Sequence, residues 1–305
     1  SCGHSRSAEL RRAKPPAGTE TMDVVHAGEM PWGESLVAQR GGGTAVAHKR
    51  LFEGTEDSPD HYLLVMAREP NTYFSPRHRH PWDQVRFCLE GSIPIAKGVF
   101  VDGGEIAYFP ESTHYGPQEG GEDRVVLLLQ FGGTSGQGFI GPDRMKQARL
   151  EMMEHGRFED GVYKQDVVEG RRNRDAYEAI WLHVKGDVPT YAAPVYKTPV
   201  VIRPAALPWR LSHEAGVSTR EIGVFPHRGL SITSYRLAPG GSHVFPADTA
   251  LRLLFVTAGT GHIEKHELRH WSSVRVNPGE LATLHTDSEL EWMQLTIQPV
   301  ATQYA

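Results

Sequence analysis

The sequence predicts an all-β protein made of two tandem antiparallel barrels joined by a short helical connector. The chain has 305 residues, which is enough for two domains of ordinary size. It contains 32 glycines and 21 prolines, which indicates the many turns that all-β proteins need. Short apolar runs lie between these turns, and one such unit occurs twice, which favours two copies of a single β domain.

The first barrel is expected over residues 21–140. Residues 1–20 are polar, basic and interrupted by two prolines, so we expect a flexible tail there. The barrel's strand candidates are rich in apolar and β-branched residues, and the last of them is a continuous apolar run typical of a strand buried on both faces. These candidates are residues 35–38, 44–47, 61–66 and 124–131.

The helical connector is expected over residues 141–188. Residues 143–155 and 173–185 are rich in helix formers, and a glycine follows each of them as a stop signal. The strand pattern then returns in the second barrel, over residues 189–305. Its strand candidates are residues 199–202, 230–235 and 251–257.

A pair of histidines in the first half of the chain predicts a metal site. Residues two apart on a strand point to the same face, so His78 and His80 can aim two imidazoles at one point. Imidazole suits Zn, Cu, Fe and Ni. Gln84 follows on the same face if the strand continues past a bend at Pro81, and a second hairpin that ends at His114 can bring a fourth ligand.

This stretch resembles the metal-binding motifs of the cupin superfamily. The first cupin motif reads H-x-H, three residues, Glu, six residues, Gly. Here His78, His80, Gln84 and Gly91 keep that spacing, with Gln in place of Glu. The resemblance implies a two-domain cupin, with two barrels of the jelly-roll or double-stranded β-helix type and a metal site in the first of them.

The second cupin motif reads Gly-Asp, a short strand, Pro and then His. Here it is Gly104, Glu105, Pro110 and His114, and the last interval is one residue shorter than in the common form. The resemblance implies one divalent transition metal per chain, with Fe(II) favoured over Mn, Ni, Zn and Cu. Its expected ligands are His78, His80, Gln84 and His114.

The second copy of the unit lacks these ligands. Residues 239–261 and 277–284 repeat the two motifs weakly. Proline has no side-chain donor and a cation does not ligate a metal. We therefore expect the second barrel to be structural or to hold a small ligand without metal. The positions that match His78, His80, Gln84 and His114 hold Pro246, Asp248, Arg252 and Glu289.

The charge of the predicted site favours an anionic substrate. Three imidazoles and an amide leave a divalent metal with its full charge, which makes it a strong Lewis acid. Strand alternation from Gln84 places Arg86 on the inner face, where a guanidinium needs an anionic partner. That partner is either a substrate carboxylate or an internal carboxylate such as Asp83 or Glu105, and the sequence leaves both open.

The cupin resemblance implies an Fe(II)-type dioxygenase that acts on a small carboxylate or enolate, with Arg86 as its anchor. One alternative is a redox-neutral lyase, isomerase or cyclase in which Tyr108 or Tyr115 carries a proton. Another is a non-catalytic ligand-binding or storage protein. Arg86, Tyr108 and Tyr115 are thus the candidate catalytic residues.

Composition restricts the other partners. The net charge of −5 gives no support to nucleic-acid binding, and no apolar run is long enough to span a membrane. Cys2 and Cys88 lie far apart and the N-terminal residues lack an apolar signal region, which favours the cytoplasm. Unpaired sheet edges favour a homodimer.

Overall fold

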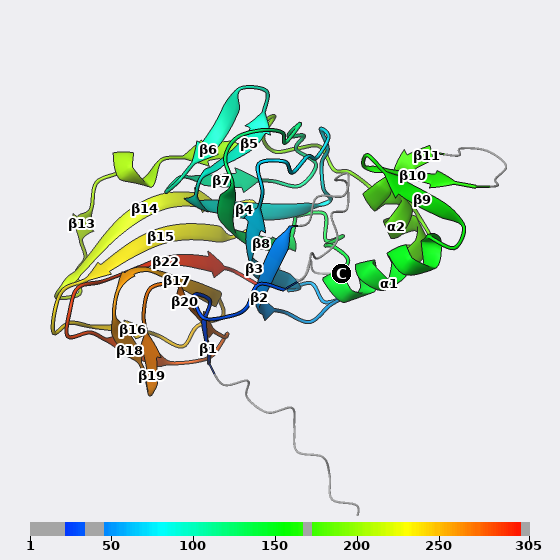
Figure 1. Cartoon of the computed structure of the whole chain (residues 1–305). Helices are drawn as coiled ribbons and strands as arrows, with labels where there is room; N and C mark the ends of the chain where they lie inside the picture. Colours follow the sequence, from blue (N-terminus) through cyan, green and yellow to red (C-terminus); the bar gives the residue numbers. More distant parts are fainter. Residues whose placement is uncertain (1–21, 34–45, 167–172, 300–305) are drawn as a thin grey trace, which may run out of the picture.

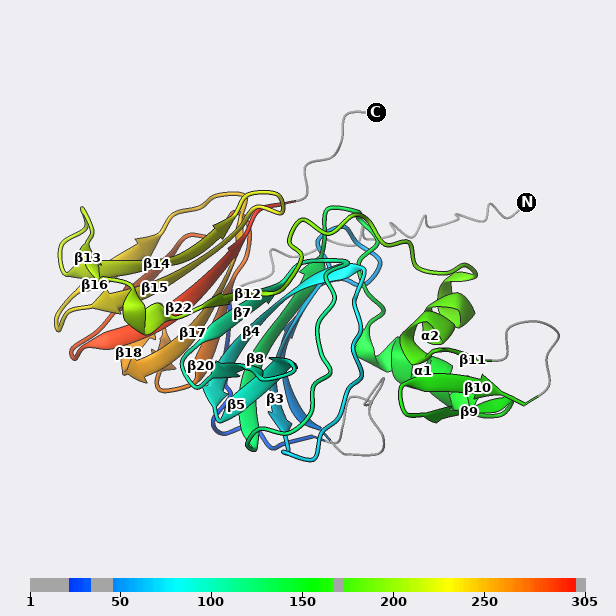
Figure 2. The same cartoon turned by 90° about the horizontal axis from the view of Figure 1, so that it is seen from above.

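The computed structural model describes residues 22–33, 46–166 and 173–299. The tail expected over residues 1–20 and the strand expected over residues 35–38 lie outside these ranges, as do residues 44 and 45 of the strand expected over 44–47. Within them the predicted all-β class is confirmed. Two bodies of antiparallel strands lie side by side, and the two α-helices lie together at one end, beside the first body (Figures 1 and 2).

The first barrel is built on a six-stranded antiparallel sheet in the order β12-β7-β4-β8-β3-β2. The hairpin of β5 and β6 and the isolated bridges Ser75–Gln118 and His78–Tyr115 are further paired segments of this barrel. The strands are β2 (Ala47–Glu53), β3 (Tyr62–Glu69), β4 (Trp82–Glu90), β5 (Ser92–Ala96), β6 (Val99–Asp102), β7 (Ile106–Phe109), β8 (Arg124–Gly132) and β12 (Val200–Ile202).

The second barrel has a seven-stranded sheet in the order β1-β20-β17-β22-β15-β14-β13 and a four-stranded sheet in the order β16-β21-β18-β19. A short 3-10 helix, η1 (Pro204–Ala206), lies between β12 and the first residues of β13. The strands are β1 (Asp23–His26), β13 (Arg210–Leu211), β14 (Val217–Phe225), β15 (Leu230–Leu237), β16 (Ser242–Phe245), β17 (Leu251–Gly259), β18 (Gly261–Ile263), β19 (His266–Leu268), β20 (Ser272–Val276), β21 (Ala282–His285) and β22 (Leu290–Ile297).

The two barrels exchange edge strands. β1, from the start of the described chain, pairs with β20 of the second barrel. β12, which follows the connector, pairs with β7 of the first barrel. The sheets therefore cross the expected domain limits of 21–140 and 189–305. Each exchanged strand also covers a sheet edge that would otherwise be unpaired.

The apolar run predicted to be buried on both faces is strand β8. Its Val125, Leu127 and Leu129 pack in a core shared with Phe225, Leu253 and other residues of the second barrel. Leu128, on the opposite face, packs against residues of the connector. Because successive side chains of a strand alternate, one strand contributes to the contact between barrels and to the first barrel's own interior.

The two helices expected in the connector are confirmed as α1 (Pro142–Met152) and α2 (Ala176–Lys185). The Asp175 side chain caps α2 by accepting hydrogen bonds from the amides of Tyr177 and Glu178, and Gly186 ends it with a φ of 84°. In the sequence between the two helices, three short strands form a small sheet that the sequence pattern did not predict. Its strands are β9 (Gly156–Glu159), β10 (Val162–Gln165) and β11 (Asn173–Asp175).

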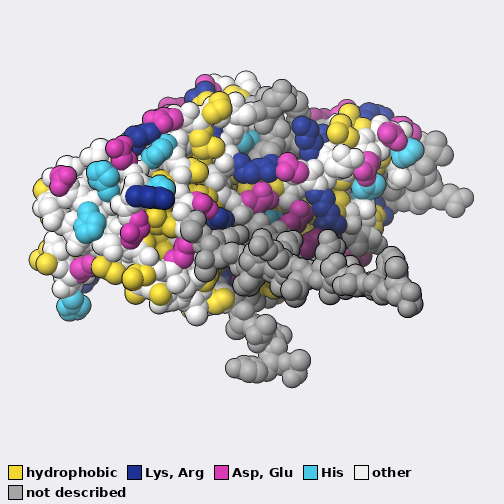
Figure 3. All heavy atoms as spheres, turned by 90° about the horizontal axis from the view of Figure 1, so that it is seen from below, with side chains coloured by type: hydrophobic (Ala, Val, Ile, Leu, Met, Phe, Trp, Pro, Cys, Tyr) yellow, Lys and Arg dark blue, Asp and Glu magenta, His cyan; other side chains and the backbone are white. Residues whose placement is uncertain are grey.

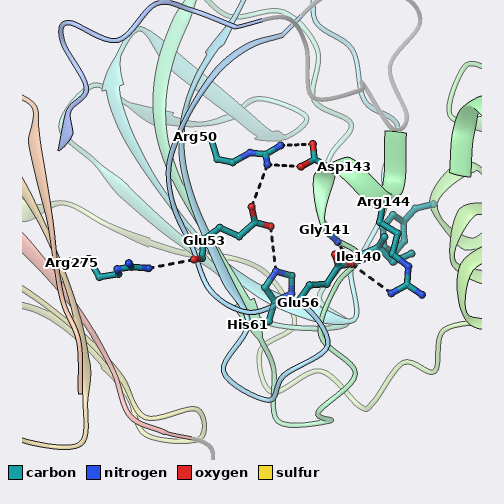
Figure 4. A network of polar contacts seen from close by, with 10 residues as sticks. Arg50, Glu53, Glu56, His61, Ile140, Gly141, Asp143, Arg144 and Arg275 are labelled. Carbon is teal, nitrogen blue, oxygen red and sulfur yellow. Dashed lines mark hydrogen bonds and ion pairs between the residues drawn. The ribbon is translucent and has the colours of Figure 1, made fainter. Parts of the chain in front are cut away.

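A polar network fixes the start of the connector to the first barrel (Figure 4). Arg50 on β2 donates two hydrogen bonds of 2.9 Å to the Asp143 carboxylate and one of 3.4 Å to Glu53. The Glu53 backbone carbonyl in turn accepts from Arg275 of the second barrel, at 3.5 Å. The network thus joins connector and both barrels at one point.

The surface carries mixed charge. On the face drawn in Figure 3, acidic, basic and hydrophobic side chains of the described residues are interspersed. None of the helices in the described ranges has the length and apolar character needed to cross a membrane.

Candidate metal and anion site

The site lies in a cavity of about 120 Å³ inside the first barrel. Four of its polar lining residues are ligands or catalytic groups expected from the sequence: His78, His80, Gln84 and Arg86. Tyr115, also predicted, lines the same cavity. Ile140, the residue before the connector, and Met145 on α1 line one side of the cavity.

Backbone pairing positions these side chains. His78 and Tyr115 form an antiparallel bridge, with reciprocal backbone hydrogen bonds of 3.0 Å. Gln84 and Arg86 are two residues apart on β4 and therefore point to one face. Val85 between them packs on the other face, in the core shared with the second barrel.

Several contacts converge on the Tyr115 hydroxyl oxygen. It lies 2.9 Å from Nε2 of His80 and accepts a hydrogen bond of 2.9 Å from the Arg86 guanidinium. The Gln84 side-chain oxygen lies 3.4 Å from it and accepts from the same Arg86 nitrogen at 3.1 Å. These side chains form one connected polar cluster.

Neighbouring groups orient two of the expected ligands. Nδ1 of His78 lies 2.6 Å from the Pro76 carbonyl oxygen, a contact that places the ring proton on Nδ1 and makes Nε2 the basic nitrogen. The Gln84 amide nitrogen donates to Gln130 at 3.0 Å, so the Gln84 oxygen faces Arg86 and Tyr115. Gln130 is the one polar residue inside the apolar run of β8, a signal that sequence reasoning missed.

The expectation that His114 supplies a fourth ligand does not agree with its placement. His114 is exposed, whereas the next residue, Tyr115, is only 2% exposed and lies in the cavity. Successive residues of an extended segment face opposite sides. The signal was in the motif itself, because the interval from Pro110 reaches its common length at Tyr115.

Tyr108 also lies outside the site. It is paired with Val85 across β4 and β7, so it shares Val85's side of the sheet and faces the second barrel. Its hydroxyl donates to Asp83 at 2.6 Å and lies 2.7 Å from Nε2 of His227. Burial, followed by the charge of Asp83, raises the pKa of Tyr108. Tyr108 therefore belongs to the contact between the two barrels and does not line the cavity in which it was expected to carry a proton.

Neither of the two internal carboxylates expected as partners of Arg86 pairs with it in the structure. Of the internal carboxylates considered, Asp83 accepts from Tyr108 and from the Glu111 amide, and Glu105 pairs with Arg203 at 2.7 Å. Among the described residues, Arg86 forms no ion pair with a carboxylate, although it is only 8% exposed.

Two buried donors beside the cavity lack acceptors in the described part of the chain. They are Nε of Arg86 and the side-chain nitrogen of Gln118, which is 1% exposed. Buried donors are nearly always paired in folded proteins. Gln118 was not among the predicted site residues. Its position next to the second motif gave no reason to single it out.

The donor set fits a metal, with a different composition from the one expected. The described residues contain no group of three His, Cys, Asp or Glu side chains that could hold an ion. The cavity instead gathers two imidazoles, an amide oxygen and a phenol oxygen. Metal–nitrogen and metal–oxygen distances of about 2.0–2.2 Å place neighbouring ligand atoms about 3 Å apart. The 2.9 and 3.4 Å separations around Tyr115 agree with that spacing.

The matching positions of the second barrel contact one another. Arg252 donates to the Pro246 carbonyl at 3.0 Å and forms an ion pair with Asp248. Arg252 is 5% exposed, whereas the side chain of its partner Asp248 is 46% exposed. Glu289 is exposed and lies 3.9 Å from Arg236.

The comparisons with known proteins agree on the fold. No family model and no curated protein matches the chain. Solved structures do match: a candidate dioxygenase from Nostoc punctiforme (TM-score 0.59, 11% identity) covers 94% of this chain and 88% of its own. Oxalate decarboxylase from Bacillus subtilis (0.54, 12%) covers 93% and 78%. The protein YlbA from E. coli (0.55, 9%) covers 93% of both chains.

These neighbours are cupins, and two of them match nearly the whole of both barrels. The chain therefore has the cupin fold. More particularly it has the two-barrel form of that fold, as the resemblance of its motifs and the repeat of the β unit predicted. At identities of 9–12% the likeness concerns the fold alone.

Proposed function

We propose that this protein is a metal-dependent cupin enzyme that acts on a small organic carboxylate in its first barrel. The observation that carries the proposal is the state of Arg86. A buried guanidinium without a carboxylate partner is costly, and its planar fork is suited to bind a carboxylate by two parallel hydrogen bonds. The Gln118 amide supplies a further donor for an acceptor-rich ligand.

The cavity limits the size of the substrate. Its volume is about 120 Å³. A cavity of about 150 Å³ accommodates a molecule the size of benzene. A short oxo acid or hydroxy acid, or the carboxylate end of a larger molecule, fits this space. The apolar residues Ile140 and Met145 would lie against the part of the substrate that is not bound by Arg86.

His78, His80 and Gln84 are the residues that would hold the metal, which we expect to be Fe(II). When bound, such an ion supplies a Lewis acid and, in the case of iron, the redox chemistry that O₂ requires. The chain's own residues bind and orient. Arg86 fixes the substrate carboxylate, Pro76 and Gln130 hold His78 and Gln84 in place, and Met145 of the connector lines one side of the cavity.

The specific activity that we propose is that of a dioxygenase. The fold shared with a candidate dioxygenase supports it, as does the expected preference of the site for iron and for anions. The test is O₂ consumption by the Fe(II)-loaded protein across a panel of small oxo acids and aromatic acids. Consumption that depends on one class of acid would identify the substrate, whereas no uptake with any acid would remove this activity.

A redox-neutral lyase or isomerase is the second candidate. The observation that favours it is the 2.9 Å contact between the Tyr115 hydroxyl and His80, which joins two groups able to carry a proton. Product formation without O₂ uptake, at the same rate under nitrogen, would select this candidate.

Substitution of Arg86 tests the proposal directly. Arg86→Lys keeps the charge but not the two parallel hydrogen bonds, so binding of a small carboxylate should weaken by about ten- to a hundredfold, as expected for hydrogen bonds to charged groups. Titration calorimetry with the acid found in the panel measures this. Arg77→Lys, a change at an exposed arginine of the same segment, is the matched control. Equal affinity in the wild type and Arg86→Lys would contradict the proposal.

A further inference from the structure

We propose that the Tyr115 phenol oxygen is a protein ligand of the metal, in the position that the second cupin motif gives to histidine. The inference rests on the proposed function in one respect, namely that the first barrel binds a metal. It goes further because the ligands predicted so far are neutral imidazoles and an amide, whereas the Tyr115 phenolate is an anionic oxygen ligand.

The backbone places Tyr115 where the motif's histidine is expected. Tyr115 lies at the common interval after Pro110, and His114 lies one residue short of it. The bridge to His78 fixes Tyr115 opposite the first expected ligand, through two backbone hydrogen bonds of 3.0 Å. Ser112, inside this turn, has a φ of 64°, the left-handed conformation that lets the chain turn toward the cavity.

The side chain is held in that place by its surroundings. The Tyr115 ring lies against the His78 ring, with 4.3 Å between centroids, and against the Phe109 ring, with 4.6 Å. Its oxygen is 2.9 Å from Nε2 of His80 and 3.4 Å from the Gln84 oxygen. These are hydrogen-bond distances, and they also match the separation of about 3 Å between neighbouring atoms that bind one ion. The phenol oxygen is therefore presented as an ordered member of the donor set.

Arg86 explains why a tyrosine suits this barrel. Its guanidinium donates to the Tyr115 oxygen at 2.9 Å, so a cation lies next to the position of the metal. A neutral imidazole at position 115 would leave the metal and the guanidinium without an anion between them. A phenolate accepts the Arg86 hydrogen bond and binds the ion with its other lone pairs, which separates the two positive charges.

The test uses the Fe(III)-loaded full-length protein. A phenolate bound to Fe(III) gives a visible charge-transfer band that imidazole and amide ligands do not give. We expect this band in the wild type and its loss in Tyr115→Phe, whose affinity for Zn²⁺ should also fall at least tenfold. Tyr115→His should recover Zn²⁺ binding without the band. Tyr73→Phe, which alters the other tyrosine that lines the cavity, should retain the band.

The outcomes separate the inference from the proposed function. Wild-type protein that binds about one equivalent of metal without the band overturns the inference and leaves the metal-dependent function standing. A band that survives in Tyr115→Phe and disappears in Tyr73→Phe also overturns it. Wild-type protein that binds neither Fe(III) nor Zn²⁺ removes both proposals. Circular dichroism of each variant shows whether it is folded.

Discussion

At the scale of single residues, the Arg86 guanidinium is the centre of the polar cluster in the site. Arg86 donates to both Gln84 and Tyr115, so the two oxygen donors are oriented by the same guanidinium. Gln84 is neutral, and this leaves the positive charge of Arg86 available to a bound anion. A carboxylate at position 84 would instead pair with Arg86 inside the protein.

Gln84→Glu is therefore expected to strengthen metal binding and to weaken binding of an anionic substrate. One added charge at about 4 Å is worth about 4 kcal/mol at an effective dielectric near 20, before relaxation. Allowing for relaxation, we expect a loss of about ten- to a hundredfold in kcat/KM. Gln130→Glu, which adds the same charge one hydrogen bond further out, is the comparison. Unchanged metal affinity and turnover in Gln84→Glu would place Gln84 outside the metal's ligands.

His114 and Tyr115 show how far residue-level prediction reaches. The sequence pattern assigns the fourth ligand to His114 because it is a histidine near the end of the motif, although the interval is one residue short. The period of two in extended chain makes such an offset decisive, because it moves a side chain from the cavity to the solvent. Arg86 was predicted correctly as inward-facing for the same reason. That Arg86 has no carboxylate partner among the described residues could not be predicted in the same way. It depends on where Asp83 and Glu105 lie in the folded chain, which no local pattern contains.

At the scale of elements, strands and helices with strong local patterns were predictable and pairings between distant segments were not. The apolar run at residues 124–131 became β8, and both connector helices formed where expected. The sheet of β9, β10 and β11 has short strands of mixed polarity, which give little periodic signal. The exchange of β1 and β12 depends on tertiary packing, because no local pattern specifies which distant strand each of them pairs with.

Helix α2 offers a test of a local signal. Its first turn is capped by Asp175, which accepts from two backbone amides at 2.9 and 3.1 Å. Asp175→Ala should lower the free energy of unfolding by about 1 kcal/mol, the usual loss for an N-cap. Urea unfolding measures it, with Asp187→Ala, an exposed change just beyond the helix, as the control. Equal losses in the two variants would show that the cap does not stabilise the helix.

At the scale of the whole molecule, the two barrels are joined by exchanged strands, a common core and buried polar contacts. The shared core contains Tyr108 and Val85 of the first barrel and Phe225 and Leu253 of the second. The exchanged strands β12 and β1 each form one outer edge of a sheet, and β2 and β13 form the opposite edges. The expected homodimer stays a prediction, which sedimentation at micromolar concentration would check.

The contact between the barrels also contains a carboxyl group with an altered pKa. Asp83 is 1% exposed, accepts from Tyr108 at 2.6 Å, and is linked through it to His227 of the second barrel. Burial raises the pKa of Asp83 to about 7, against the opposing effect of its hydrogen bonds from Tyr108 and the Glu111 amide. The folded protein therefore holds this proton at pH values where the unfolded chain has released it.

It follows that the contribution of Asp83 to stability is fully present at low pH and decreases as pH rises from about 4 to about 7. Asp83→Asn removes this titration, because its amide can donate to the Tyr108 oxygen while that hydroxyl donates to His227. Between pH 5 and 8, the free energy of unfolding of wild type should fall by about 2–3 kcal/mol relative to Asp83→Asn, at 1.36 kcal/mol per pKa unit. Urea unfolding of both proteins at the two pH values gives this difference, in which the effects of titrating groups distant from Asp83 and Tyr108 cancel. Asp102→Asn, at an exposed position, should run parallel to wild type. Parallel curves for Asp83→Asn and wild type would mean that Asp83 keeps an ordinary pKa, so that the contact between the barrels tolerates its charge.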